Sequence, residues 1–95
     1  MQILDDFEAM LKGIADELGF GFATSGYKGR GGYILSKPGI TVGFTCFINR
    51  TGNLTILMSP NLSRSPVDLG TYTQAELKGK NSKARKAILV KLLKN

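Results

Sequence analysis

The chain has 95 residues, of which 42% are hydrophobic and 21% charged, a composition typical of one globular domain. It contains no histidine and one cysteine, Cys46, which excludes histidine-based nucleophile systems, histidine metal sites and internal disulfides. The 13 basic and seven acidic residues leave a net charge of +6, which points to a negatively charged partner.

The same features predict where the protein resides. No apolar run approaches the roughly 20 residues that a membrane helix needs. The first ten residues carry acidic side chains where an export signal would carry basic ones. An unpaired cysteine suits a reducing compartment. We therefore expect a cytoplasmic protein with no membrane partner.

An amphipathic helix is predicted from about Leu4 to Leu18. Apolar residues recur along this segment at the spacing of one helix face: Ile3, Phe7, Met10, Leu11, Ile14 and Leu18. Acidic side chains crowd the first turn, where the helix dipole favours them, and Gly19 is suited to end the helix. We interpret the acidic residues as a solvated face rather than a catalytic or metal-binding set.

A glycine-rich segment separates two short predicted strands, Gly19–Thr24 and Tyr33–Ser36. Four of the eight residues 25–32 are glycine, which predicts a mobile loop. Lys28 and Arg30 give this loop cationic groups that suit a phosphate backbone, although a plain hairpin loop explains the same composition.

The clearest predicted element is a β-hairpin over residues 39–59. Apolar residues fall there at every second position: Ile40, Val42, Phe44, Cys46, Ile48, then Leu54, Ile56 and Met58. This alternation indicates a sheet with one buried face, on which Cys46 is a structural thiol rather than a nucleophile. A turn is expected at residues 49–52, and Pro38-Gly39 suits a type II turn into the hairpin.

The segment 60–79 is the least readable, because Pro60, Pro66 and Gly70 interrupt any long element. One or two helical turns are predicted after Thr73, with Thr73 as the cap and Glu76 three residues further on. A final helix is predicted from about Ser82 to Lys94. Its apolar residues should pack on the sheet: Ala84, Ile88, Leu89, Leu92 and Leu93.

Basic residues gather where the final helix begins, and we predict that they bind an anionic partner: Lys78, Lys80, Lys83, Arg85 and Lys86. Residues 77–95 hold seven bases and no acid. A helix N-terminus presents free N–H groups and positive potential, so this cluster suits a phosphate clamp. A solvated lysine face that keeps the protein in solution is the competing interpretation. Lys28, Arg30 and Lys37 are expected to assist binding.

The predicted order of helix, three strands and helix resembles the double-stranded RNA-binding domain. The segment 79–87, GKNSKARKA, is similar to the start of that family's second helix, where a glycine, a serine and closely spaced lysines precede alanines. The resemblance implies that Lys83 and Lys86 hold phosphates and that the loop Lys37-Pro38-Gly39 probes a minor groove. That loop usually carries a histidine in the family, and this chain has none.

The sequence thus predicts a single α+β domain over residues 1–95, with an N-terminal helix, an antiparallel meander of three to four strands, and a basic C-terminal helix packed on one sheet face. The first functional hypothesis is a non-enzymatic module that binds the backbone of RNA or DNA. The second is a protein-interaction module, such as a phage-type inhibitor of host defence resembling anti-CRISPR proteins, which docks on a nucleoprotein complex. No catalytic residue, metal or cofactor is expected, and an exposed edge strand would allow a homodimer.

Overall fold

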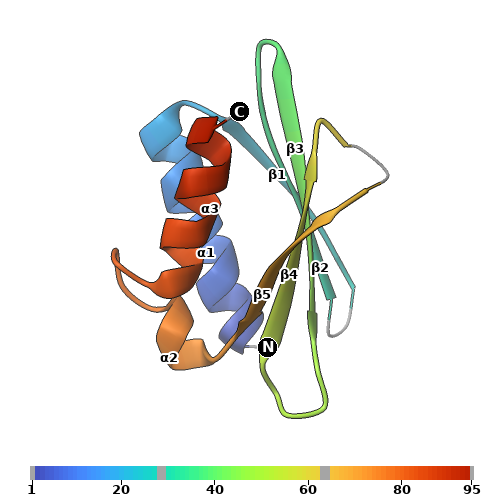
Figure 1. The fold of residues 1–95 in the computed structure, drawn as a ribbon, viewed down its shortest axis with the longest axis vertical. Helices are drawn as coiled ribbons and strands as arrows, with labels where there is room; N and C mark the ends of the chain where they lie inside the picture. The colour runs from blue at the N-terminus through green and yellow to red at the C-terminus, as the bar shows by residue number, and fades with distance from the viewer. Residues whose placement is uncertain (1, 28–29, 63–64, 95) are drawn as a thin grey trace.

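The computed structural model describes residues 2–27, 30–62 and 65–94, and for residues 25–27 and 30 it describes the backbone alone. Its elements are, in order, α1 (Gln2–Leu18), β1 (Gly21–Tyr27), β2 (Arg30–Lys37), β3 (Ile40–Ile48), β4 (Leu54–Pro60), β5 (Val67–Tyr72), α2 (Gln74–Leu77) and α3 (Lys83–Lys94). The strands form one antiparallel meander in the order β1-β2-β3-β4-β5, and the helices all lie on one face of it (Figure 1). The predicted α+β architecture is confirmed, with five strands instead of three or four.

Helix α1 buries the apolar stripe that its sequence predicts. Phe7, Leu11 and Ile14 are fully buried against the sheet. The helix ends at Leu18, where Gly19 takes the left-handed φ of +78° that a side chain disfavours. The amide of Phe20 then donates to the carbonyl oxygen of Ala15 at 2.8 Å, which satisfies a carbonyl that the helix end leaves free.

The centre of the sheet supplies the other half of the core. Val42, Phe44 and Cys46 of β3 are at most 1% exposed, as the alternation of that strand predicts. The hairpin turns also form as expected, with Gly39 at a φ of +86° and Gly52 at +84°. The side-chain oxygen of Asn49 accepts hydrogen bonds from the backbone of the second turn, which fixes the register of β3 against β4.

The prediction of a mobile loop over residues 25–32 is wrong, because the described part of this segment is strand. Residues 25–27 continue β1, residues 30–32 begin β2, and they pair in register, with Gly26 opposite Gly31. The physical reason lies in Tyr33, whose ring occupies the space above Gly31: a β-carbon on Gly31 would lie 2.6 Å from the phenol oxygen. Glycine here makes room for an aromatic ring on the sheet and does not indicate flexibility.

The segment 60–79, which is the least readable in the sequence, contains β5, which was not predicted, and α2, which was. β5 is six residues long and is interrupted by a register shift opposite Ile56 and Leu57, with Gly70 at a φ of +111°. This irregularity removes the strict alternation that identifies a strand in sequence. The predicted cap of α2 is confirmed: the Thr73 side chain accepts from the amide of Glu76, and the Glu76 carboxylate accepts from the amide of Thr73.

Helix α3 packs on the sheet beside α1 and begins directly after Ser82, where the sequence predicts its start. The Ser82 hydroxyl oxygen accepts from the amide of Arg85 at 3.2 Å, and Ala84, Ile88 and Leu92 are buried. Leu93 was expected to pack with them, but it is 72% exposed. It lies about 100° further round the helix than Leu92, beyond the arc that faces the core. None of the helices in the described part of the chain is long and apolar enough to cross a membrane.

Two glycine-to-alanine substitutions separate a glycine that the packing requires from one that it does not. Gly31→Ala should lower the free energy of unfolding by about 1–3 kcal/mol, because the new methyl group displaces the Tyr33 ring. Gly13→Ala, at a position in α1 with no atom within 4 Å of the new β-carbon, should raise it by up to about 1 kcal/mol. Urea denaturation of both variants measures the difference, and equal effects would contradict this account of Gly31.

Candidate functional site

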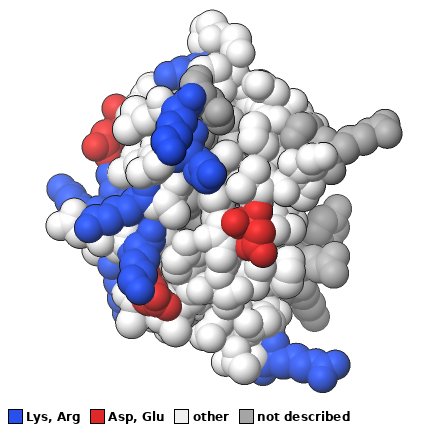
Figure 2. Space-filling view, viewed as in Figure 1, with Lys and Arg blue, Asp and Glu red and all other residues white. Residues whose placement is uncertain are grey.

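The exposed side of α3 and the segment before it form a surface made of lysines. We define the lysine face as the exposed residues Lys78, Lys80, Lys83, Lys86, Lys91 and Lys94. Because α3 buries Ala84, Ile88 and Leu92, its lysines are directed to the side away from the sheet. Figure 2 shows the basic side chains gathered over this part of the molecule.

Arg85, which was predicted to bind an anionic partner together with these lysines, instead forms an ion pair within the fold. Its guanidinium group donates to the carboxylate of Glu17 near the end of α1, and its side chain is only 13% exposed. An arginine held by a carboxylate in this way ties α3 to α1 and has little charge left for a partner. The acidic helix therefore neutralises one member of the predicted cluster.

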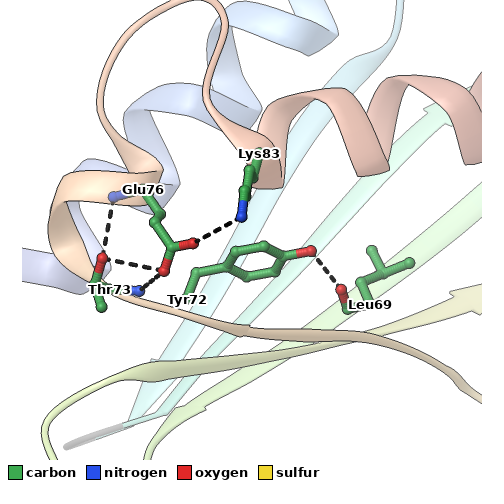
Figure 3. A network of polar contacts seen from close by, with 5 residues as sticks. All are labelled: Leu69, Tyr72, Thr73, Glu76 and Lys83. Atoms are coloured by element: carbon green, nitrogen blue, oxygen red, sulfur yellow. Dashed lines mark hydrogen bonds and ion pairs between the residues drawn. The ribbon is translucent and has the colours of Figure 1, made fainter.

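Lys83 makes a weaker contact with an acidic residue. Its ammonium nitrogen lies 4.0 Å from a carboxylate oxygen of Glu76, and the Lys83 side chain is 80% exposed (Figure 3). The Glu76 carboxylate is mainly engaged in capping α2, since Thr73 donates to it from both its amide and its hydroxyl group. These hydrogen bonds lower the pKa of Glu76, with a smaller contribution from Lys83. Lys83 is thus free to exchange this contact for another anion.

The other five members of the lysine face make no ion pair with any residue that the structure describes. Lys78 and Lys80 lie in the connection between α2 and α3, and Lys86, Lys91 and Lys94 lie on α3 itself. Like charges so close together repel one another, so this arrangement lowers stability unless an anion neutralises it.

Of the remaining predicted residues, the structure describes the side chain of Lys37 alone. Lys37, at the end of β2, places its ammonium nitrogen 4.5 Å from the centre of the Phe20 ring, a cation–π contact within the fold. Lys28 lies outside the described residues, and Arg30 is described only by its place in β2, opposite Phe47. Their part in binding stays a prediction.

A groove beside the lysine face was not predicted from the sequence. It has a volume of about 470 Å³ and lies between α1 and the connection from α2 to α3. Met10 and Leu77 contribute apolar surface, the missing side chain of Gly13 leaves it open, and Lys78 and Lys80 line one side. Asp6 also lines the groove, and its carboxylate accepts a hydrogen bond from Gln74 at 2.8 Å, a contact between residues 68 positions apart that no local pattern reveals.

Cys46, the one cysteine of the chain, is not placed to act as a nucleophile. Cys46 is fully buried, and its Sγ donates to the carbonyl oxygen of Gly31 at 3.5 Å. Burial raises the pKa of the Cys46 thiol to about 12, so the nucleophilic thiolate is scarce at neutral pH. Burial likewise raises the pKa of Tyr33 next to it. Among residues 2–27, 30–62 and 65–94, no three acidic or cysteine side chains are grouped closely enough to hold a metal ion.

Comparison with known proteins found no match to any family model, to any curated protein or to any solved structure. The fold also departs from the double-stranded RNA-binding outline, because five strands and a short additional helix stand between the two long helices. The roles that this resemblance implies for Lys83 and Lys86 therefore rest on their exposure and charge alone.

If Arg85 holds the two long helices together, its loss should be coupled to the loss of Glu17. Arg85→Gln and Glu17→Gln should each destabilise the protein, and the double variant should be less destabilised than the two single effects predict, by about 1 kcal/mol. Denaturation of the four proteins gives this coupling energy. Strict additivity would show that the ion pair contributes nothing to the fold.

The buried thiol should react only when the protein opens. At pH 8, a thiol with a pKa of about 12 is thiolate in about one molecule in 10⁴, against roughly one in four for an exposed cysteine. Labelling of native Cys46 with Ellman's reagent should therefore be at least about 1,000-fold slower than in concentrated urea. Comparable rates in the two conditions would show that the thiol is accessible in the folded protein.

Proposed function

We propose that the protein is a non-enzymatic module that binds the phosphate backbone of nucleic acid through the lysine face. The observation that carries the proposal is the set of five exposed lysines, from Lys78 to Lys94, without an ion-pair partner among the described residues. Phosphates would neutralise these charges and release the counterions condensed on the nucleic acid, which is the main source of affinity in backbone binding.

The size of the surface suits a duplex. The 12 residues of α3 span about 18 Å, a length over which double-stranded nucleic acid presents roughly ten phosphate charges. Lysine is a flexible point charge that binds phosphate without reading the edges of bases. Binding with little sequence preference follows, and it takes place in the cytoplasm, where Cys46 remains reduced.

A second candidate function, docking on an acidic protein within a nucleoprotein complex, is favoured by two apolar residues of α3. Val90 is 49% exposed and Leu93 72% exposed, and both lie between lysines on the solvent side of the helix. An apolar contact framed by cations suits a helix that lies in the groove of an acidic protein, as an inhibitor of a host complex would require.

The salt dependence of binding tests the first function. The variant Lys78→Gln/Lys80→Gln/Lys86→Gln should bind generic duplex RNA or DNA more weakly than the natural sequence at low salt. Each lysine–phosphate contact makes the slope of log K against log salt more negative by about 0.9, so the magnitude of the slope should decrease by about 2–3 in the triple variant. Fluorescence anisotropy over a series of salt concentrations measures both quantities.

Arg50→Gln and Val90→Ser are the matched controls. Arg50 is exposed in the turn between β3 and β4, away from α3, so its loss should leave the slope unchanged. Val90→Ser removes apolar surface and keeps all lysines, so it should leave nucleic-acid binding intact but weaken docking on an acidic protein. Absence of nucleic-acid binding at low salt, or equal effects of Arg50→Gln and the triple variant, would overturn the first function.

A further inference from the structure

The helices leave one face of the sheet uncovered (Figure 1). By the strand register this face carries serines and threonines, such as Thr45, Thr55 and Ser59, together with a few apolar side chains. On it, Ile34 of β2 is 40% exposed, and Leu62, just after β4, is 56% exposed. Phe47 and Leu57 are partly exposed on the same face, as the pairing of Phe47 with Thr55 and of Thr45 with Leu57 shows. Asp68 is the only charged residue among the described side chains of this face.

A knob and a hollow lie side by side on this face. Leu62 adopts a left-handed φ of +57°, which a leucine disfavours, and its side chain rests on Gly43, where a β-carbon would lie 3.1 Å from Cδ2 of Leu62. Leu62 itself forms part of the wall of a hollow of about 240 Å³, whose lining also includes Gly32, Gly43, Thr45 and Ser59. An apolar side chain is thus held in a left-handed conformation and 56% exposed, at the edge of a recess in the sheet face.

We propose that this face is an interface between two copies of the chain, packed sheet to sheet about a two-fold axis with Leu62 of each copy in the hollow of the other. A knob and a recess on a single face are self-complementary under two-fold symmetry, which is the arrangement that closed dimers use. Sheets packed face to face in this way bury the side chains of both inner faces in a common layer.

The charge distribution favours a second copy as the occupant. The chain carries a net charge of +6, and its lysine face lies on the opposite side of the sheet. Contact through the uncovered face keeps the two lysine faces as far apart as the fold allows, whereas contact through α3 would bring them together.

The area is sufficient for a weak dimer. With five strands, spaced about 4.8 Å apart and about seven residues long, the face measures roughly 24 by 23 Å. Two copies would bury about 1,100 Å² in total, just above the roughly 1,000 Å² of the smallest specific interfaces. We therefore expect association in the micromolar range rather than a permanent dimer.

Sedimentation velocity over a concentration series, from about 1 µM to 1 mM, tests the proposal. The average mass should rise from the 10.3 kDa of one chain towards twice that value. Ile34→Asp and Leu62→Asp should each weaken association at least about tenfold, because both place a charge in the apolar interface. Leu62→Asp is the variant that endangers folding least, since aspartate tolerates the left-handed conformation better than leucine.

Leu93→Asp is the matched control, because it makes the same change at an exposed leucine of α3 and should leave association unchanged. Thermal unfolding of all variants confirms that they are folded. A monomer at every concentration would overturn the proposal. A dimer that persists in both Ile34→Asp and Leu62→Asp would also overturn it, and would indicate pairing through an edge strand. None of these variants alters a lysine, so the outcome is independent of nucleic-acid binding.

Discussion

Burial of α1 against the middle of the sheet is the interaction on which the rest of the structure depends. The ring of Phe7 meets the ring of Tyr33 edge-on at 5.5 Å, and Tyr33 in turn lies over Gly31. Each aromatic side chain buried in this way contributes roughly 2 kcal/mol or more of hydrophobic stabilisation. Because the described helices all lie on one face of the sheet, α1 shares a single buried layer with α3, which contributes Ala84, Ile88 and Leu92 to the same core.

The basic residues are divided by this packing into two groups with different physical roles. Arg85 is pulled toward Glu17 because α3 lies beside α1, and Lys37 is held over the Phe20 ring. Among the residues that the structure describes, the lysines that face away from α1 meet no carboxylate that could neutralise them, apart from the distant contact of Lys83 with Glu76. The separation of acids in α1 from bases in α3 therefore leaves a cationic surface even though the helices are neighbours.

Local patterns in the sequence predict those elements whose residues repeat regularly. The stripe of α1, the alternation of β3 and β4 and the Thr73–Glu76 cap all follow from spacing within the chain. β5 escaped prediction because its bulge and Gly70 break the alternation. The glycine-rich segment misled because the role of Gly31, to accommodate the ring of Tyr33, depends on the packing of a side chain two positions further along the same strand.

The candidate site is less predictable for a similar reason. The exposure of Lys83 and Lys86 follows from the helical pattern of α3. The engagement of Arg85 does not, because Glu17 lies 68 residues away in sequence. The groove lined by Met10, Leu77 and Lys78 depends on the same long-range packing. Spacing alone identifies which residues face solvent, but only the tertiary arrangement determines which charges remain free.

The meander has a consequence for the order in which the domain is assembled. Each strand pairs with its neighbour in sequence across a short connection, so the hairpins have little entropy to lose on closing. The helical layer, by contrast, is closed by Gln74 on Asp6, Ser82 on Met10 and Arg85 on Glu17, contacts that span 68 to 72 residues. We expect the hairpins to form early and the union of α1 with α3 to limit the folding rate.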